Sequence, residues 1–101
     1  MDRRLELQGI LEEILGSRNV YFQPPSSIRL KYPAIVYTRK SIDNTRAGDV
    51  SYKMETEYEA VVIDQDPDSE IVYKLSLLPY CKHTAHYETD NLNHDAFRIY
   101  Y

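Results

Sequence analysis

Residues 51–64 read SYKMETEYEAVVID and carry the clearest pattern in this chain. Apolar, aromatic or small residues occupy one set of alternate positions, and charged residues occupy the other, namely Lys53, Glu55, Glu57 and Glu59. Successive side chains of a strand point to opposite faces, so this alternation predicts a long, half-buried β-strand. Residues 60–63, AVVI, are apolar at every position, which predicts that the second half of the strand is covered on both faces.

A partner strand is predicted just before this segment, at residues 32–42. Pro33 can stand at the start of a strand. Residues 34–37, AIVY, are apolar at every position, so the strand is expected to be buried on both faces there. Residues 43–49, DNTRAGD, have the composition of a loop. The two strands are therefore expected to form a hairpin with an extended tip.

Two helices are predicted, one on each side of this hairpin in the chain. In residues 2–15 the apolar side chains follow helical spacing, at Leu7, Ile10, Leu11, Ile14 and Leu15. Asp2 is the expected N-cap, and Gly16 is the expected left-handed end. The second helix follows a turn at residues 64–70, with Asp68 as its expected cap and Pro79 beyond its end.

Two shorter strands are predicted at the C-terminus, at residues 81–89 and 96–101, with a turn at 90–94. Residues 19–22 form a short extended piece before the Pro24-Pro25 corner. The predicted order is α-β-β-α-β-β in a single domain, residues 1–101. It indicates an α+β fold, a mostly antiparallel sheet with two helices packed on one face.

Composition narrows the classes of function. A chain of 101 residues with a formal charge of −4 and pI near 5.3 lacks the basic balance of nucleic-acid-binding proteins. It has no apolar run of membrane-spanning length. Cys81 is the single cysteine, so no internal disulfide is expected and synthesis in a reducing cytoplasm fits. Ten tyrosines either pack on strands or mark contact surfaces, and their number favours an assembling protein.

One group of side chains invites a test for metal binding: His83, His86, Asp90, His94 and Asp95. Imidazole and carboxylate groups are ligands of zinc and other transition metals. However, the separation of His83 and His86 is odd, so a regular strand would point them to opposite faces. No metal site is therefore predicted.

The other candidates for chemistry are equally weak. The row of Glu55, Glu57 and Glu59 could supply a general acid and base or bind calcium. Such a row more often indicates a solvent-exposed face, or a face that contacts basic groups such as Arg39 and Lys40 of the paired strand. Cys81 has only His83 nearby and is expected to be a small buried residue. The three glycines are scattered, so no phosphate-binding loop is predicted. We expect no catalytic or cofactor-binding residue.

Opposite charges on the hairpin suggest an interface. The basic residues near the loop either form a solvated surface or belong to an arm that contacts a neighbouring subunit. Pairing of positive with negative side chains sets register between subunits. The candidate subunit or partner interface consists of Arg39, Arg46, Lys53, Glu55, Glu57, Glu59 and Tyr100.

Four segments together resemble a known protein family. They are residues 5–16 (LELQGILEEILG), 19–25 (NVYFQPP), 30–37 (LKYPAIVY) and 87–101 (YETDNLNHDAFRIYY). They look like the small tail-terminator, or tail-completion, proteins of tailed phages and related tail-like particles. The similarity covers most of the chain, with QPP, YP and DNLNH as its more specific parts, and residues 43–82 add little to it.

The resemblance implies a structural virion protein, neither an enzyme nor dependent on a cofactor. Such proteins form a ring, commonly a hexamer, on the last ring of the tail tube at its head-proximal end. The ring stops tube growth and offers a surface to the head-tail connector protein. Its partners would be copies of itself, the tail tube protein and the connector, with no recognition of nucleic-acid sequence and no membrane.

Two other readings remain open from the sequence. One is a head-tail joining (connector or head-completion) protein, or a small adaptor module without catalytic activity. The other is a small hydrolase or metal-dependent enzyme built on the histidine group.

Overall fold

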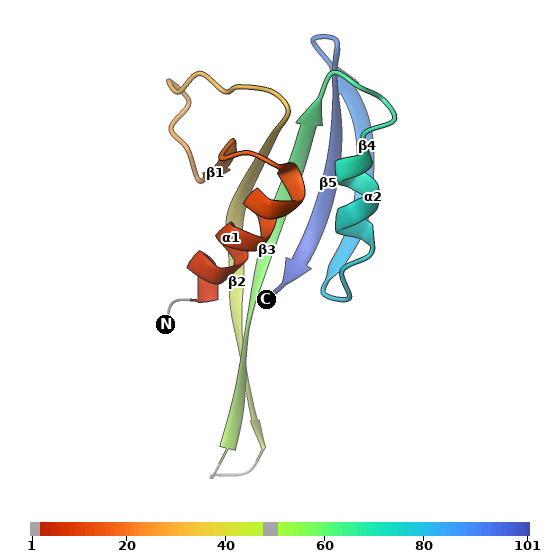
Figure 1. Cartoon of the computed structure of the whole chain (residues 1–101). Helices are drawn as coiled ribbons and strands as arrows, with labels where there is room; N and C mark the ends of the chain where they lie inside the picture. Colours follow the sequence, from red (N-terminus) through yellow and green to blue (C-terminus); the bar gives the residue numbers. More distant parts are fainter. Residues whose placement is uncertain (1–2, 48–50) are drawn as a thin grey trace.

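The computed structural model describes residues 3–47 and 51–101, and the side chains of residues 43–55 lie outside that description. The described residues form the following elements in chain order: α1 (Arg3–Leu15), β1 (Val20–Phe22), β2 (Ala34–Ala47), β3 (Ser51–Asp64), α2 (Glu70–Ser76), β4 (Cys81–Thr89) and β5 (Leu92–Tyr100). The α+β class predicted from the sequence is confirmed (Figure 1).

One mixed sheet holds all the strands of the described chain, in the order β1-β2-β3-β5-β4. The prediction missed β1, so the observed order is α-β-β-β-α-β-β, and the sheet is not purely antiparallel because β1 runs parallel to β2. Backbone bonds at both ends of β1 hold it in place. The N–H of Ile35 donates to the carbonyl of Asn19 at 3.0 Å, and the N–H of Gln23 donates to that of Tyr37 at 2.9 Å.

The β2–β3 hairpin is longer than predicted. Residues 43–47, expected to be loop, continue β2, and the ladder runs from Ala34 opposite Ile63 to Ala47 opposite Ser51. Residues 48–50 lie outside the described residues. β5 pairs with β3 only from Glu57 onward, so residues 42–47 and 51–56 project beyond the sheet as a two-stranded ribbon. We call this ribbon the arm (Figure 1).

Helix α1 agrees well with its predicted pattern. Leu7, Leu11 and Leu15 are buried, while the isoleucines of the stripe are only half-buried. Gly16 ends the helix with φ of +81°, a left-handed conformation that suits glycine, and its N–H donates to the carbonyl of Glu12 at 2.8 Å. The expected cap, Asp2, lies outside the described residues.

Helix α2 is short and depends on packing. Ser69, not Asp68, stands at its N-cap position, and no side chain caps the helix there. The backbone N–H of Asp68 instead donates to the carboxylate of Asp66 at 2.9 Å, within the preceding turn. Leu75 is fully buried, whereas Tyr73 and Leu77 are exposed. A helix of this length is stable mainly through such tertiary contacts.

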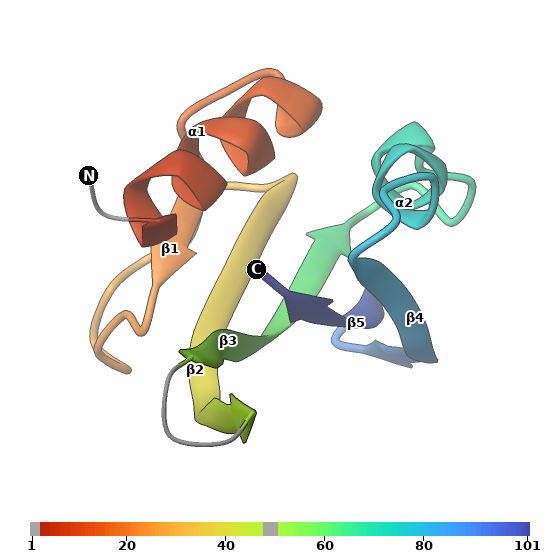
Figure 2. The ribbon, with the colours of Figure 1, turned by 90° about the horizontal axis from the view of Figure 1, so that it is seen from below.

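The core lies between the helices and one face of the sheet. Figure 2 looks along the strands and shows α1 and α2 on the same side of the sheet. Leu7, Leu11 and Leu15 of α1 and Leu75 of α2 pack in one cluster with alternate residues of the central strands. These strand residues are Ile35, Tyr37, Tyr58, Ala60, Val62, Phe97 and Ile99. The expectation that 34–37 and 60–63 are buried on both faces is wrong for Val36 and Val61, which are half-buried because no helix covers the second face.

The β4–β5 hairpin turns at Asp90 and Asn91, which have φ of 53° and 62° between paired Thr89 and Leu92. Two consecutive positive φ values define a tight turn that follows the twist of the strands. The predicted turn at 90–94 is therefore too long: Leu92, Asn93 and His94 belong to β5. The tighter turn places these side chains in the ladder and decides which face each one occupies.

Candidate functional site

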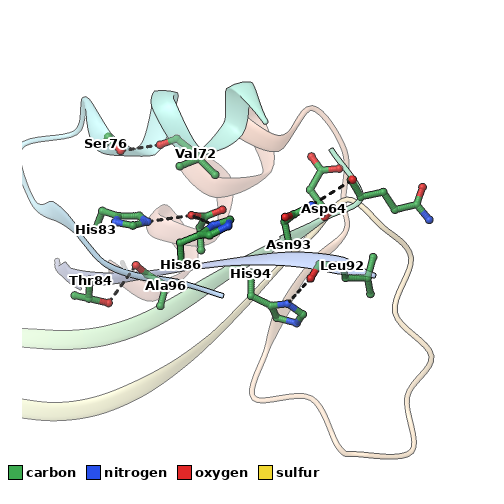
Figure 3. Close-up of polar contacts among 12 residues, drawn as sticks. Asp64, Val72, Ser76, His83, Thr84, His86, Leu92, Asn93, His94 and Ala96 are labelled. Carbon is green, nitrogen blue, oxygen red and sulfur yellow. Dashed lines mark hydrogen bonds and ion pairs between the residues drawn. The ribbon is translucent and has the colours of Figure 1, made fainter. Parts of the chain in front are cut away.

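A β-bulge in β4 creates the main polar cluster of the molecule. The register of β4 against β5 shifts between His83 and Ala85, leaving Thr84 without a partner in the ladder. One extra residue in a strand reverses the facing of everything beyond it. His83 and His86 consequently lie on the same side of the sheet (Figure 3), and the prediction that they point to opposite faces is wrong.

Both imidazoles bind one oxygen of Asp95. His83 Nε2 lies 3.0 Å and His86 Nδ1 lies 2.8 Å from Asp95 Oδ1. Since a carboxylate only accepts, each imidazole donates an N–H, which sets the Nε2–H tautomer for His83 and the Nδ1–H tautomer for His86. Asp95 is buried in β5 and opposite Val62 of β3. The two imidazoles thus supply hydrogen-bond donors to a buried carboxylate on the face of the sheet next to α2 (Figure 3).

The remaining members of the predicted histidine group are elsewhere. His94 is on the opposite face of the sheet (Figure 3), where its ring stacks on Tyr87 with centroids 4.9 Å apart. Its Nδ1 lies 3.2 Å from the carbonyl oxygen of Leu92. Asp90 is in the turn. In the described part of the chain, no set of three or more histidine, cysteine or acidic side chains is arranged to hold a metal ion.

Cys81 lacks the features of a nucleophile. It begins β4 and packs, partly buried, against the core cluster, close to the small buried role expected of it. Burial raises the pKa of its thiol from the ordinary value of 9.0 to about 11, so the thiol stays protonated at neutral pH. A reactive cysteine needs the opposite shift, toward the thiolate.

Glu57 and Glu59, the members of the glutamate row whose side chains the structure describes, face away from the helices, and Glu57 has a basic partner on β5. Arg98 Nε lies 3.0 Å from Glu57 Oε2, and Ser41 Oγ approaches Glu57 Oε1 at 3.5 Å. Glu59 is exposed and stands opposite Arg98 in the ladder. Tyr100 lies opposite Glu57 with 38% of its surface exposed. The structure thus brings the predicted residues Glu57, Glu59 and Tyr100 onto one surface.

The basic residues predicted for that surface are not all there. Arg39 pairs with buried Tyr58, and its guanidinium lies 5.9 Å from the ring centroid of Phe22, so it belongs to the helix side of the sheet. The idea that Arg39 faces the glutamate row is therefore wrong. The side chains of Arg46, Lys53 and Glu55 lie outside the described part of the molecule.

The sequence does not predict that several apolar side chains are exposed, because each of them fits the regular apolar spacing of its strand or helix. Ile42, at the base of the arm, is 51% exposed, and Leu77 after α2 is 83% exposed. Neither helix reaches the arm (Figure 1). A long hairpin with an apolar residue beyond the last core contact is the sequence signal that could have predicted an exposed side chain here.

Comparison with known proteins adds no family to these observations. No protein-family model matches the chain, and no curated protein matches it significantly. Across the described residues, no helix combines the length and the apolar composition that crossing a membrane requires.

Proposed function

We propose that this chain is a structural component of a phage tail, one that forms a ring at the head-proximal end of the tail tube, stops tube growth and presents a surface for head attachment. The proposal starts from the resemblance of residues 5–16, 19–25, 30–37 and 87–101 to tail-terminator proteins. It assigns the protein no catalytic step and no cofactor. Its partners are further copies of this chain, in a ring that we take to be hexameric, the tail tube protein and the head-tail connector.

The observation that carries the proposal is the arm. The ladder between β3 and β5 ends at the Glu57–Tyr100 pair, and the N–H of Tyr101 still donates to the carbonyl of Thr56 at 3.0 Å; past Thr56, β2 and β3 are paired with each other. A two-stranded ribbon is only marginally stable in water, and Ile42 leaves half of its surface exposed at its base. Contact with a neighbouring subunit would cover this side chain and support the ribbon.

Ring formation requires such an element. A closed ring is built from head-to-tail contacts, in which one surface of each subunit meets a different surface of the next. An arm that reaches past its own sheet supplies one half of such a contact. The longest dimension of the molecule is 52 Å, against 26 and 22 Å for the other two, so the contact can lie well away from the subunit's own core.

Deletion of the gene from the phage that encodes it tests the proposed function. Loss of a terminator leaves tube growth unchecked, so the lysate should contain overlong or polymerised tails, measured by electron microscopy. Complementation with the full chain should restore tails of uniform length. Tails of normal length that are not attached to heads would contradict the terminator role and indicate a head-tail connector.

A further inference from the structure

The sheet has a second face that no helix covers (Figure 2). The register of the strands places the residues of this face in transverse rows. We call it the open face. The register places a charged row made of Thr38, Glu59, Arg98 and Lys82 beside an apolar row made of Val36, Val61, Ala96 and Ala85. In the next row Ala34 and Ile63 are already buried within the subunit, and the stacked rings of His94 and Tyr87 occupy the positions on β5 and β4.

The open face has the composition of a contact surface. A sheet with one solvated face normally alternates apolar inward and polar outward residues. Here Val36, Val61 and Ala96 face outward in the centre and remain half-buried. The charged row borders them on one side, and His94 and Tyr87 border Ala96 and Ala85 on the other, so polar groups flank an apolar centre as in many interfaces.

The charges of the open face are complementary to themselves. Consider a two-fold axis that lies in the contact plane, parallel to the strands and between β3 and β5. Rotation about this axis places β3 of one copy over β5 of the other. Glu59 of one copy then faces Arg98 of the other, and Val61 faces Ala96. Glu59 forms no ion pair within the described chain, whereas Arg98 is paired through Nε with Glu57 and has its remaining guanidinium N–H groups to offer.

We propose that two copies of this chain pack through their open faces, as an α/β/β/α dimer with the two sheets face to face. Sheets packed in this way lie about 10 Å apart with strands within about 30° of alignment. A two-fold contact of this kind uses the same patch on both copies. It involves a surface different from the arm and does not depend on the proposed function.

Sedimentation equilibrium of the full chain, from micromolar to millimolar concentration, tests the proposal. The expected species is twice the 11.9 kDa of one chain. Glu59→Arg places like charges together twice per dimer and should raise the dimer dissociation constant at least tenfold. The double variant Glu59→Arg/Arg98→Glu restores opposite charges and should return the constant to within about threefold of the original.

Glu88→Arg is the matched control, because it makes the same charge change on β4 opposite Asn93, on the helix side of the sheet. It should leave the dissociation constant unchanged. If copies also join through the arm, Glu59→Arg should halve the mass of the assembly while Glu88→Arg should not. Equal effects of the two reversals, or failure of the double variant to recover, would overturn the proposal.

An experiment on the unmodified chain removes any dependence on how the variants fold. In a dilution series followed by amide NMR, the signals of Val36, Val61 and Ala96 should shift with concentration more than those of α1. A chain that stays monomeric throughout, with these signals moving only when tail tube protein is added, would assign the open face to that protein and contradict the dimer.

Discussion

At the scale of single residues, the cluster around Asp95 shows how one inserted residue decides local chemistry. In a regular strand, His83 and His86 would point to opposite faces of the sheet. The bulge at Thr84 places both on the same face. Nothing in the sequence marks that bulge. Asp95 gains two N–H donors from it, which offsets the cost of burying a carboxylate.

Asp95→Ala removes the acceptor that both imidazoles share. The histidines are half-exposed and can turn to water, so the expected loss is about 1–2 kcal/mol in the free energy of unfolding, measured by urea denaturation. Asp95→Asn is the control, since its amide oxygen can still accept both bonds, and it should cost less than about 1 kcal/mol. Equal losses for the two variants would show that these bonds contribute nothing to stability.

Cys81 should impose a pH dependence on stability in the alkaline range. Burial raises the pKa of its thiol from 9.0 to about 11, so the folded chain retains this proton at pH values where the unfolded chain has lost it. Stability from this group is therefore complete below pH 9 and is lost as the pH rises toward 11. Tyr37 and Tyr80 also have raised pKa values through burial and act in the same direction at somewhat higher pH.

Comparison with Cys81→Ala isolates the thiol. Urea denaturation at several pH values should give parallel curves of unfolding free energy for both proteins below pH 9. Between pH 9 and 11 the original chain should lose stability more steeply than the variant. Curves that stay parallel up to pH 11 would contradict the assigned burial.

At the scale of elements, long regular patterns were predictable and short or irregular ones were not. The strand predicted at residues 51–64 has the same bounds as β3. The helix predicted at residues 2–15 differs from α1 by one residue at its start. The extended piece at residues 19–22 was predicted, but not as a strand of the sheet, because three residues show no periodicity and the stability of β1 comes from distant backbone partners on β2. Residues 43–47 have the composition of a loop, but pairing with β3 makes them strand.

The turn between β4 and β5 depends on a backbone conformation that few residues tolerate. Asn91 has φ of 62°, which asparagine and glycine accept and β-branched residues do not. Asn91→Gly should leave the midpoint of urea denaturation unchanged or slightly higher, and Asn91→Val should lower stability by about 1–2 kcal/mol. A neutral Asn91→Val would mean that the hairpin closes by a different turn.

The arm should be dispensable for folding. Replacing residues 42–56 by Asn-Gly joins Ser41 to Glu57, which already stand opposite each other, through a favoured two-residue turn. Because Ile42 and Thr56, the two deleted residues whose side chains the structure describes, lie outside the core cluster, the melting temperature should change by only a few degrees. Loss of cooperative unfolding in this shortened chain would show that the arm belongs to the core.

At the scale of the whole molecule, the helices cover one face of the sheet, and neither the arm nor the open face has a helix on it (Figure 1 and Figure 2). The tyrosines and the glutamate row predict a contact surface, and the structure places Glu57, Glu59 and Tyr100 next to one another on the open face. Which strands pair side by side could not be read from the chain, since the order β3-β5-β4 follows from tertiary packing. The arm and the open face are the surfaces through which we expect particle assembly.

The most direct measurement is the length of tail tubes assembled in vitro from the cognate tube protein with and without this chain, imaged by electron microscopy. Substoichiometric addition of the full chain should stop elongation and give short tubes, and Ile42→Asp on the arm should abolish that effect. Ile28→Asp, the same change at an isoleucine 43% exposed and away from the arm, should cap tubes normally. Tubes that grow to the same length whether or not the chain is present would contradict the proposed function.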